Sequence, residues 1–293
     1  MSDAGIGRKK KYKVDFFVVT LGGSRKQVKV RSFLAAAVDG MTPPKALVEL
    51  EDEEHMIRSL VSLNDGKVYK GVFGRCRFNE TPVQGNREGK ERDVQLLPGH
   101  GLVEKNHFLF FMETNLLVYQ RNPAGSHSSK FQHYLNSAIE VEKPFLLEPI
   151  LTRDAYKRMF EGGAIKWLEL SFQLPKDATL FENLDFKKAV DLTRDSNAVA
   201  AKLRLTVGRT DKRLAERLKD ALSEIAKTDM AKVAKVRLED FDEPIDLIAE
   251  RIIETIDVEI GKNGRPIPDD VFRKLQAAKD KRASDLKAFF KDS

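Results

Sequence analysis

Apolar runs of strand length alternate along this chain with segments of helical spacing, and no other feature of the sequence restricts the fold as much. Residues 108–112 and 116–120 are two apolar runs separated by a short polar turn, which is the pattern of a β-hairpin. Residues 126–137 follow, with Phe131 and Tyr134 at the spacing of one helix face. Strands and helices that intermix in this way predict an α+β fold, with a mixed sheet and flanking helices.

Turns rich in glycine and asparagine divide the rest of the chain into the same two kinds of element. The clearest are Gly22-Gly23-Ser24 and Asn64-Asp65-Gly66, each between two apolar runs. Residues 81–101 are charged and poor in large apolar side chains, and they predict a long exposed loop around at most one short element. The expected strands are 12–21, 26–31, 46–50, 57–63, 67–78, 108–112, 116–120, 143–151, 165–173, 198–207 and 232–238. The expected helices are 32–39, 126–137, 153–161, 180–194, 212–227 and 269–290.

Two segments near the C-terminus bear on the domain organisation. Residues 245–256 carry isoleucines at helical spacing, although Val258 and Ile260 then alternate as in a strand. The best candidate for a domain boundary lies near residues 193–197. We therefore expect a globular α+β domain over residues 1–195 and a smaller α/β domain, basic and dimerising, over residues 196–293.

The sequence favours a reducing compartment and a protein outside the membrane. Cys76 is the only cysteine and has no partner within the chain, and the chain has only five histidines. The basic N-terminus precedes a short apolar run that Gly22-Gly23 ends, without the cleavage site of a signal peptide. No stretch approaches the roughly 18 apolar residues that a membrane span needs. A cytoplasmic protein is expected.

Charge is segregated along the chain. The formal net charge is +6, and residues 1–31 hold nine basic side chains against two acids. Residues 239–259, called the acidic segment below, hold nine acids against one arginine. Clustered cations of this kind are the electrostatic mark of a protein that binds a polyanion.

Motifs for the common catalytic chemistries are absent from the sequence. There is no phosphate-binding Gly-x4-Gly-Lys-Ser/Thr loop, no Gly-x-Ser-x-Gly elbow, no His-Glu-x2-His pair and no Cys-x2-Cys. Arg121 and His127 have a spacing that resembles the ribonuclease motif of HEPN domains, but a proline and a glycine between them break the helix that this chemistry requires. His100 and His107, with Glu104 between them, lack a third ligand at metal-site spacing. We expect no enzyme, cofactor or metal.

Basic clusters are the better candidates for a functional site. Three lysines precede the first strand, five cations flank the loop at 81–101, and others gather on a strand, a turn and a helix between residues 202 and 219. A solvated helix face would account for the last group alone, but its neighbours on the strand favour phosphate binding. The predicted nucleic-acid-binding residues are Lys9, Lys10, Lys11, Arg75, Arg77, Arg87, Lys90, Arg92, Lys202, Arg204, Arg209, Lys212, Arg213, Arg217 and Lys219.

The order of these elements resembles that of the RexA family, the DNA-binding component of phage exclusion systems. The matching segments are 12–34, 108–111, the turn 123–125, the helix at 131–135, 141–151, the basic stretch 202–217 and the turn and helix from 261. The loop at 81–100 and the acidic segment depart from the family pattern. The resemblance implies a homodimer that binds double-stranded DNA without sequence preference in phage exclusion, with a separate membrane effector protein as partner.

The last expected helix supplies an argument for the dimer. Its apolar side chains lie among lysines and arginines, so the stripe must pack on another surface, and we expect a second copy of the chain. The predicted interface residues are Val271, Leu275, Ala278, Leu286 and Phe290. Two alternatives to DNA binding remain open: a nuclease or ribonuclease of a defence system that uses Arg121 and His127, and a protein-interaction module with basic surfaces.

Overall fold

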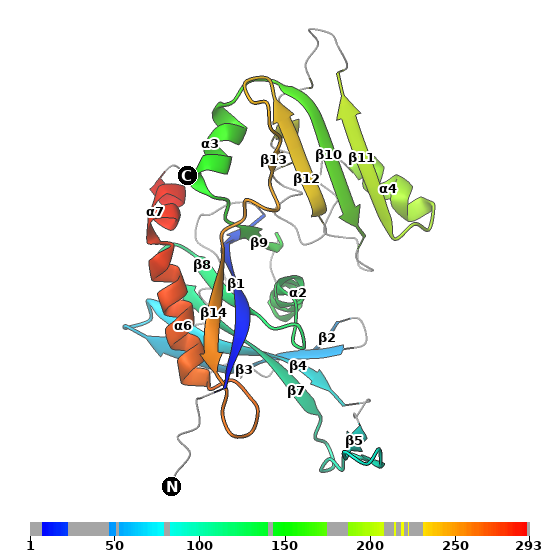
Figure 1. The fold of residues 1–293 in the computed structure, drawn as a ribbon, viewed down its shortest axis with the longest axis vertical. Coiled ribbons are helices and arrows are strands. Elements are labelled where there is room, and N and C mark those ends of the chain that lie inside the picture. The colour runs from blue at the N-terminus through cyan, green and yellow to red at the C-terminus, as the bar shows by residue number, and fades with distance from the viewer. Residues whose placement is uncertain are drawn as a thin grey trace.

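Two antiparallel sheets carry most of the secondary structure, the smaller at the top of Figure 1 and the larger below it. The computed structural model describes residues 8–22, 47–50, 53–78, 83–139, 143–174, 187–207, 214, 218–219, 222 and 231–291. The larger sheet has the order β14 (Ile253–Glu259), β1 (Lys9–Leu21), β8 (Leu116–Arg121), β7 (Leu102–Phe111), β4 (Val68–Arg77), β3 (Glu53–Leu63) and β2 (Val48–Leu50), with β9 (Phe145–Pro149) also paired to β1. The smaller sheet has the order β11 (Ala200–Thr206), β10 (Ile165–Gln173), β12 (Ala231–Leu238) and β13 (Ile245–Asp246). A hairpin of β5 (Val83–Gly85) and β6 (Glu91–Asp93) stands apart. This mixture of sheets and helices confirms the α+β class.

Helices cover both faces of the larger sheet. The helices of the described residues are α2 (Ser128–Ala138), α3 (Arg153–Glu161), α4 (Lys187–Asp195), α6 (Pro268–Lys281) and α7 (Ala283–Lys291). Of these, α2 and α6 lie on opposite faces of the larger sheet. On one face Phe131 of α2 packs in the same core cluster as Phe17. On the other face Leu275 of α6 packs with Phe16. Successive residues of β1 thus enter opposite cores, and because both faces of the strand are covered, its apolar run is continuous rather than alternating.

Several elements lie where the sequence predicts them. The turn between β3 and β4 places Asn64, Asp65 and Gly66 at φ values of 53°, 54° and 83°, a left-handed conformation that asparagine, aspartate and glycine tolerate best. Helix α3 and strand β10 match the predicted bounds at both ends. The strand expected at 26–31, the helix expected at 32–39 and most of the helix expected at 212–227 lie outside the described residues.

The helical spacing of residues 245–256 does not correspond to a helix, and the prediction of one long terminal helix is wrong. Residues 245–246 and 253–259 form β13 and β14 instead. The terminal helix is two helices, because α6 ends at Lys281, and Arg282, between α6 and α7, turns back to bind Glu254. Residues 81–101 also contain more structure than expected, since β5 and β6 form a hairpin there.

The apolar stripe of the terminal helices packs on the chain's own sheet. Val271 and Leu275 are 0% exposed, and Ala278 and Leu286 are 4% exposed, all within the cluster formed with β1, β8 and β14. Phe290 is partly buried against the same cluster. This corrects the expected dimer interface: the side chains assigned to it already cover an internal core and are not available to a second copy.

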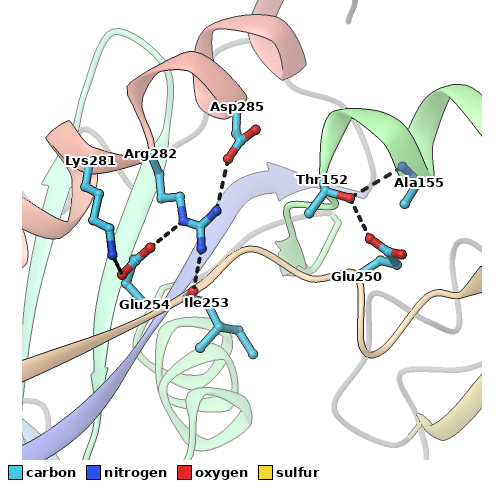
Figure 2. A network of polar contacts seen from close by, with 8 residues as sticks. All are labelled: Thr152, Ala155, Glu250, Ile253, Glu254, Lys281, Arg282 and Asp285. Atoms are coloured by element: carbon cyan, nitrogen blue, oxygen red, sulfur yellow. Dashed lines mark hydrogen bonds and ion pairs between the residues drawn. The ribbon is translucent and has the colours of Figure 1, made fainter.

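Acid–base contacts fasten α6 and α7 to β14 (Figure 2). The buried carboxylate of Glu254 accepts from Nζ of Lys281 at 2.8 Å and from Nε of Arg282 at 2.6 Å. Arg282 also donates to the carbonyl oxygen of Ile253 and to Asp285, each at 3.3 Å. Nearby, Glu250 of the acidic segment accepts from the Thr152 hydroxyl at 2.8 Å, at the start of α3.

These contacts predict that stability falls in acid. Burial alone would raise the pKa of Glu254, but the hydrogen bonds and charges of Lys281 and Arg282 outweigh it and lower that pKa. A carboxylate with a lowered folded pKa contributes stability above its unfolded pKa and loses it as the pH falls through the folded value. We expect the unfolding free energy from urea titrations to decline from about pH 5 towards pH 3.

The variant Glu254→Gln should lower the unfolding free energy at neutral pH by about 1–3 kcal/mol, because a charged acceptor is lost. It should also flatten the acid decline. An unchanged decline in the variant would show that other carboxylates cause it.

The two sheets do not divide at the expected boundary near residue 195. Strand β10 precedes that position and β11 follows it, yet all of β11 pairs with residues 167–173 of β10. Strand β14 follows the boundary and pairs with β1 near the start of the chain. The smaller sheet, with α3 and α4, is therefore inserted between β9 and β14 of the larger one.

Candidate nucleic-acid interface

The smaller sheet has one buried face. Leu168, Leu170 and Phe172 alternate along β10 and enter a core that includes Met159 of α3 and Val190 of α4. Both helices therefore cover the same side. Side chains at the intervening positions of β10, β11 and β12 point to the opposite side.

That opposite side, called the open face below, is covered by no helix within the described part of the chain. Cross-strand pairing fixes its members, because directly opposed residues of antiparallel strands project to the same side. Glu169 of β10 lies opposite Arg204 of β11 and Lys235 of β12, and Trp167 lies opposite Arg237. The described residues of the open face are Trp167, Glu169, Ser171, Gln173, Ala200, Lys202, Arg204, Thr206, Val233, Lys235, Arg237 and Asp246.

The cations of the open face form two rows. Lys202 and Arg204 lie two residues apart on β11, and Lys235 and Arg237 lie two residues apart on β12. Along a strand this spacing is about 6.8 Å, and the rows are separated by β10, so they lie about 10 Å apart. These four side chains are called the open-face cations below.

Carboxylates neutralise only part of this charge. Lys202 pairs with Glu169 at 3.0 Å, and Lys235 pairs with Asp246 at 3.5 Å. Arg204 lies over the Trp167 ring, 5.2 Å from its centroid, and no described carboxylate is within ion-pairing distance of Arg204 or Arg237. The face therefore carries a positive excess beside an indole ring.

The hairpin of β5 and β6 is electrically balanced. Its predicted binding residues Arg87, Lys90 and Arg92 alternate with three acids, Glu88, Glu91 and Asp93. Lys90 lies 3.6 Å from Glu88, and Arg92 donates to Gln84 at 3.1 Å. The structure thus brings these cations together with acids rather than with the open-face cations.

The cations on β4 have internal partners as well. Arg75 pairs with Glu53 on the neighbouring strand β3, and Arg77 lies 3.9 Å from Glu104 on β7. Both arginine side chains are about one-third exposed or less. They stabilise the larger sheet, and their phosphate-binding capacity is reduced accordingly.

The N-terminal lysines face the acidic segment. Pairing of β1 with β14 sets Lys9 opposite Glu259 and Lys11 opposite Asp257, while Lys10 lies over the ring of Tyr12. Opposite charges in such cross-strand positions attract each other. Charges that are far apart in the sequence therefore meet in the fold.

The remaining predicted cations fall into two groups. Lys219 is 4% exposed, and its ammonium donates to the carbonyl oxygen of Gly162 at 2.8 Å, so its assignment to DNA binding is corrected: it is a buried structural lysine. The rest lie outside the described residues: Arg209, Lys212, Arg213 and Arg217.

Arg121 and His127 do not share a helix face. Arg121 ends β8 and forms an ion pair with Asp15, whereas His127 is the N-cap of α2 and contacts the Ser129 hydroxyl at 3.3 Å. Residues of a helical ribonuclease motif must project together to act on one phosphate. The nuclease hypothesis gains no geometric support from these positions.

The histidines at 100 and 107 are also in different surroundings. His107 is buried against Gln120, 2.7 Å from its side-chain oxygen, and burial lowers its pKa. His100 is exposed and contacts the carbonyl oxygen of Pro98. Among the described residues, no group of three or more His, Cys, Asp or Glu side chains is placed to hold a metal ion.

Trp167, Lys235 and Arg237 are absent from the sequence prediction of the site. Lys235 and Arg237 occupy alternate positions of a strand that was correctly expected, which is a signal that they share a face. Their place beside Arg204 and Trp167 depends on strand order and register, which the spacing within one strand does not specify.

Comparison with known proteins identifies a family whose function is unknown. A protein-family profile matches residues 8–284, and its description is a family of unknown function, DUF6731. No curated protein matches the chain. None of the helices in the described ranges combines the length and apolarity needed to cross a bilayer.

Proposed function

The chain belongs to the DUF6731 family of unknown function, and from the residues of the open face we propose that it binds DNA without reading base sequence. The observation that carries the proposal is the pair of cation rows on a sheet face left uncovered by the described helices. Lysine and arginine side chains in such rows bind phosphates and release the counterions condensed on a nucleic acid.

The chemistry of the open face favours phosphate over base recognition. Glu169, the carboxylate between the two rows, is paired with Lys202, so the face presents mainly cations. No recognition helix projects from this face in the described residues, and sequence-specific readers usually place a helix or ribbon in the major groove. The sequence-based expectation of duplex DNA rests on the cation clusters and on the resemblance to the RexA family, and phosphates are common to paired and unpaired strands.

The biological setting comes from the resemblance to the RexA family. On that basis we propose a role in phage exclusion, as a homodimer that acts with a membrane effector protein. The dimer would have to form through surfaces other than the stripe of α6 and α7, which is buried.

Fluorescence anisotropy with labelled DNA of unrelated sequences tests the proposed function. Four phosphate contacts predict a log–log salt slope of about −3, so affinity should fall by about 60-fold between 50 and 200 mM salt. Unrelated sequences should bind within a few-fold of each other. Affinity confined to one sequence, or insensitive to salt, would contradict phosphate-based binding.

A polyglutamate chain of similar net charge is the matched control ligand. An acidic protein partner would use the same open-face cations, and polyglutamate would then compete with DNA at equal charge concentration. We expect weak competition, because arginine matches the geometry of phosphate oxygens in addition to their charge. Competition at parity would favour the protein-interaction hypothesis instead.

A further inference from the structure

We propose that the open face accepts a single-stranded segment, with an unpaired base stacked on the indole of Trp167. This inference rests on the proposed function, and it names the form of nucleic acid that the site takes. Trp167 is the only tryptophan in the chain, and it lies half-buried on a central strand of the smaller sheet.

The first argument is the position of the ring. Trp167 lies opposite Thr206 on one neighbouring strand and opposite Arg237 on the other. Its counterparts on the buried face, Ile165 and Leu168, are 1% and 0% exposed, whereas the indole does not enter that core. A large aromatic side chain on the solvent side of a sheet, within a field of cations, has the combination of a stacking surface and phosphate ligands that single-strand binders use.

The second argument is the state of the ring face. Arg204 lies 5.2 Å from the ring centroid, so one face of the indole already attracts a flat cationic group. A nucleobase is also flat, and it can replace the guanidinium or form a layer with it. Arg204, released from the ring, is two residues from Lys202 and can turn to a phosphate beside the stacked base.

The third argument separates single from double strands. In a duplex both faces of each base are covered by neighbouring base pairs, so an aromatic side chain cannot stack without unstacking a step. An unpaired strand exposes its base faces at no such cost. The sheet is also narrow, since four strands span about 14 Å, which suits one extended strand laid along the cation rows.

Intrinsic fluorescence of Trp167 provides the test, because its signal comes from one residue. The full chain is titrated with an unlabelled oligothymidine and, separately, with a duplex of the same length. We expect oligothymidine to bind at least about tenfold more tightly than the duplex, and to quench Trp167 at saturation.

Substitutions at residue 167 separate stacking from charge. Trp167→Ala should weaken binding of labelled oligothymidine by about 5- to 100-fold, whereas Trp167→Phe, which keeps a ring, should recover most of that affinity. Neither variant should alter the salt slope, because the phosphate contacts remain. Phe78→Ala, which removes an exposed ring just after β4 and outside the open face, is the matched control, and thermal melts establish that each variant is folded.

Each result decides the inference. Quenching by oligothymidine, with the alanine and phenylalanine variants separated as stated, supports it. Duplex binding at least as tight as oligothymidine binding, with Trp167 fluorescence unchanged, overturns it while the proposed function stands. If neither ligand binds, the proposed function fails, and the inference fails with it.

Discussion

Replacing all four open-face cations with alanine should weaken DNA binding by about 100-fold or more at low salt. The variant carries the substitutions Lys202→Ala, Arg204→Ala, Lys235→Ala and Arg237→Ala. Each lost phosphate contact also removes about 0.7–0.9 from the log–log salt slope, so the residual binding should be nearly independent of salt. Anisotropy titrations at several salt concentrations measure both quantities.

The hairpin of β5 and β6 provides a control with three cations removed. Arg87→Ala, Lys90→Ala and Arg92→Ala together should reduce affinity by no more than a few-fold, because these cations are balanced by acids on the same hairpin. If the hairpin variant lost more affinity than the open-face variant, the DNA site would lie on the hairpin, and its assignment to the open face would be wrong.

Truncating the chain after Pro268 should abolish cooperative folding rather than release a stable monomer. The deletion removes Val271, Leu275 and Leu286, which are 0–4% exposed in the core shared with β1. Burial of such a side chain contributes about 1.5–3 kcal/mol, and a domain of ordinary stability has only about 5–15 kcal/mol in total. The face of β1 that carries Phe16 would also become exposed, which favours aggregation.

Point substitutions on α6 give a graded version of this experiment. Leu275→Ala should lower the unfolding free energy by about 2–5 kcal/mol, whereas Gln276→Ala, on the exposed side of the same helix, should change it by less than about 0.5 kcal/mol. Urea titrations followed by circular dichroism measure both values. A truncated chain that unfolds cooperatively, at the same urea midpoint as the full chain, would contradict an internal role for α6.

The sequence predicted elements where local pattern and tertiary packing agree. Helix α3 has a Thr152 cap that accepts from the amide of Ala155, and its predicted and observed bounds coincide. The helical spacing at 245–256 did not reveal strand β14, whose buried positions are Glu254, Ile256 and Val258. A carboxylate on the inward side interrupts the apolar alternation of a strand, and the cations that make its burial possible lie on α6 and just after it.

The candidate site was predicted only in part for a related reason. A cluster of basic residues in the sequence does not indicate which of its side chains form ion pairs with carboxylates in the fold. Arg75 and Lys9 lie next to Glu53 and Glu259 through strand pairings that no local pattern specifies. Lys202 and Arg204, predicted as nucleic-acid-binding residues, are exposed in the structure. Trp167 was missed because its solvent-facing position follows from the packing of β10 against α3 and α4.

Pairing between β1 and β14 has a consequence for the order in which the protein assembles during synthesis. Residues 9–15 leave the ribosome early, but their partners at 253–259 emerge only after the whole inserted sheet has been made. One edge of β1, and the apolar side that α6 will cover, must therefore wait while some 90 residues of the smaller sheet and its helices are translated, which takes several seconds or more at typical rates. Contacts this distant in sequence form slowly. The nascent larger sheet is thus the stage at which a chaperone, or a slowed ribosome, would most affect the yield of folded protein.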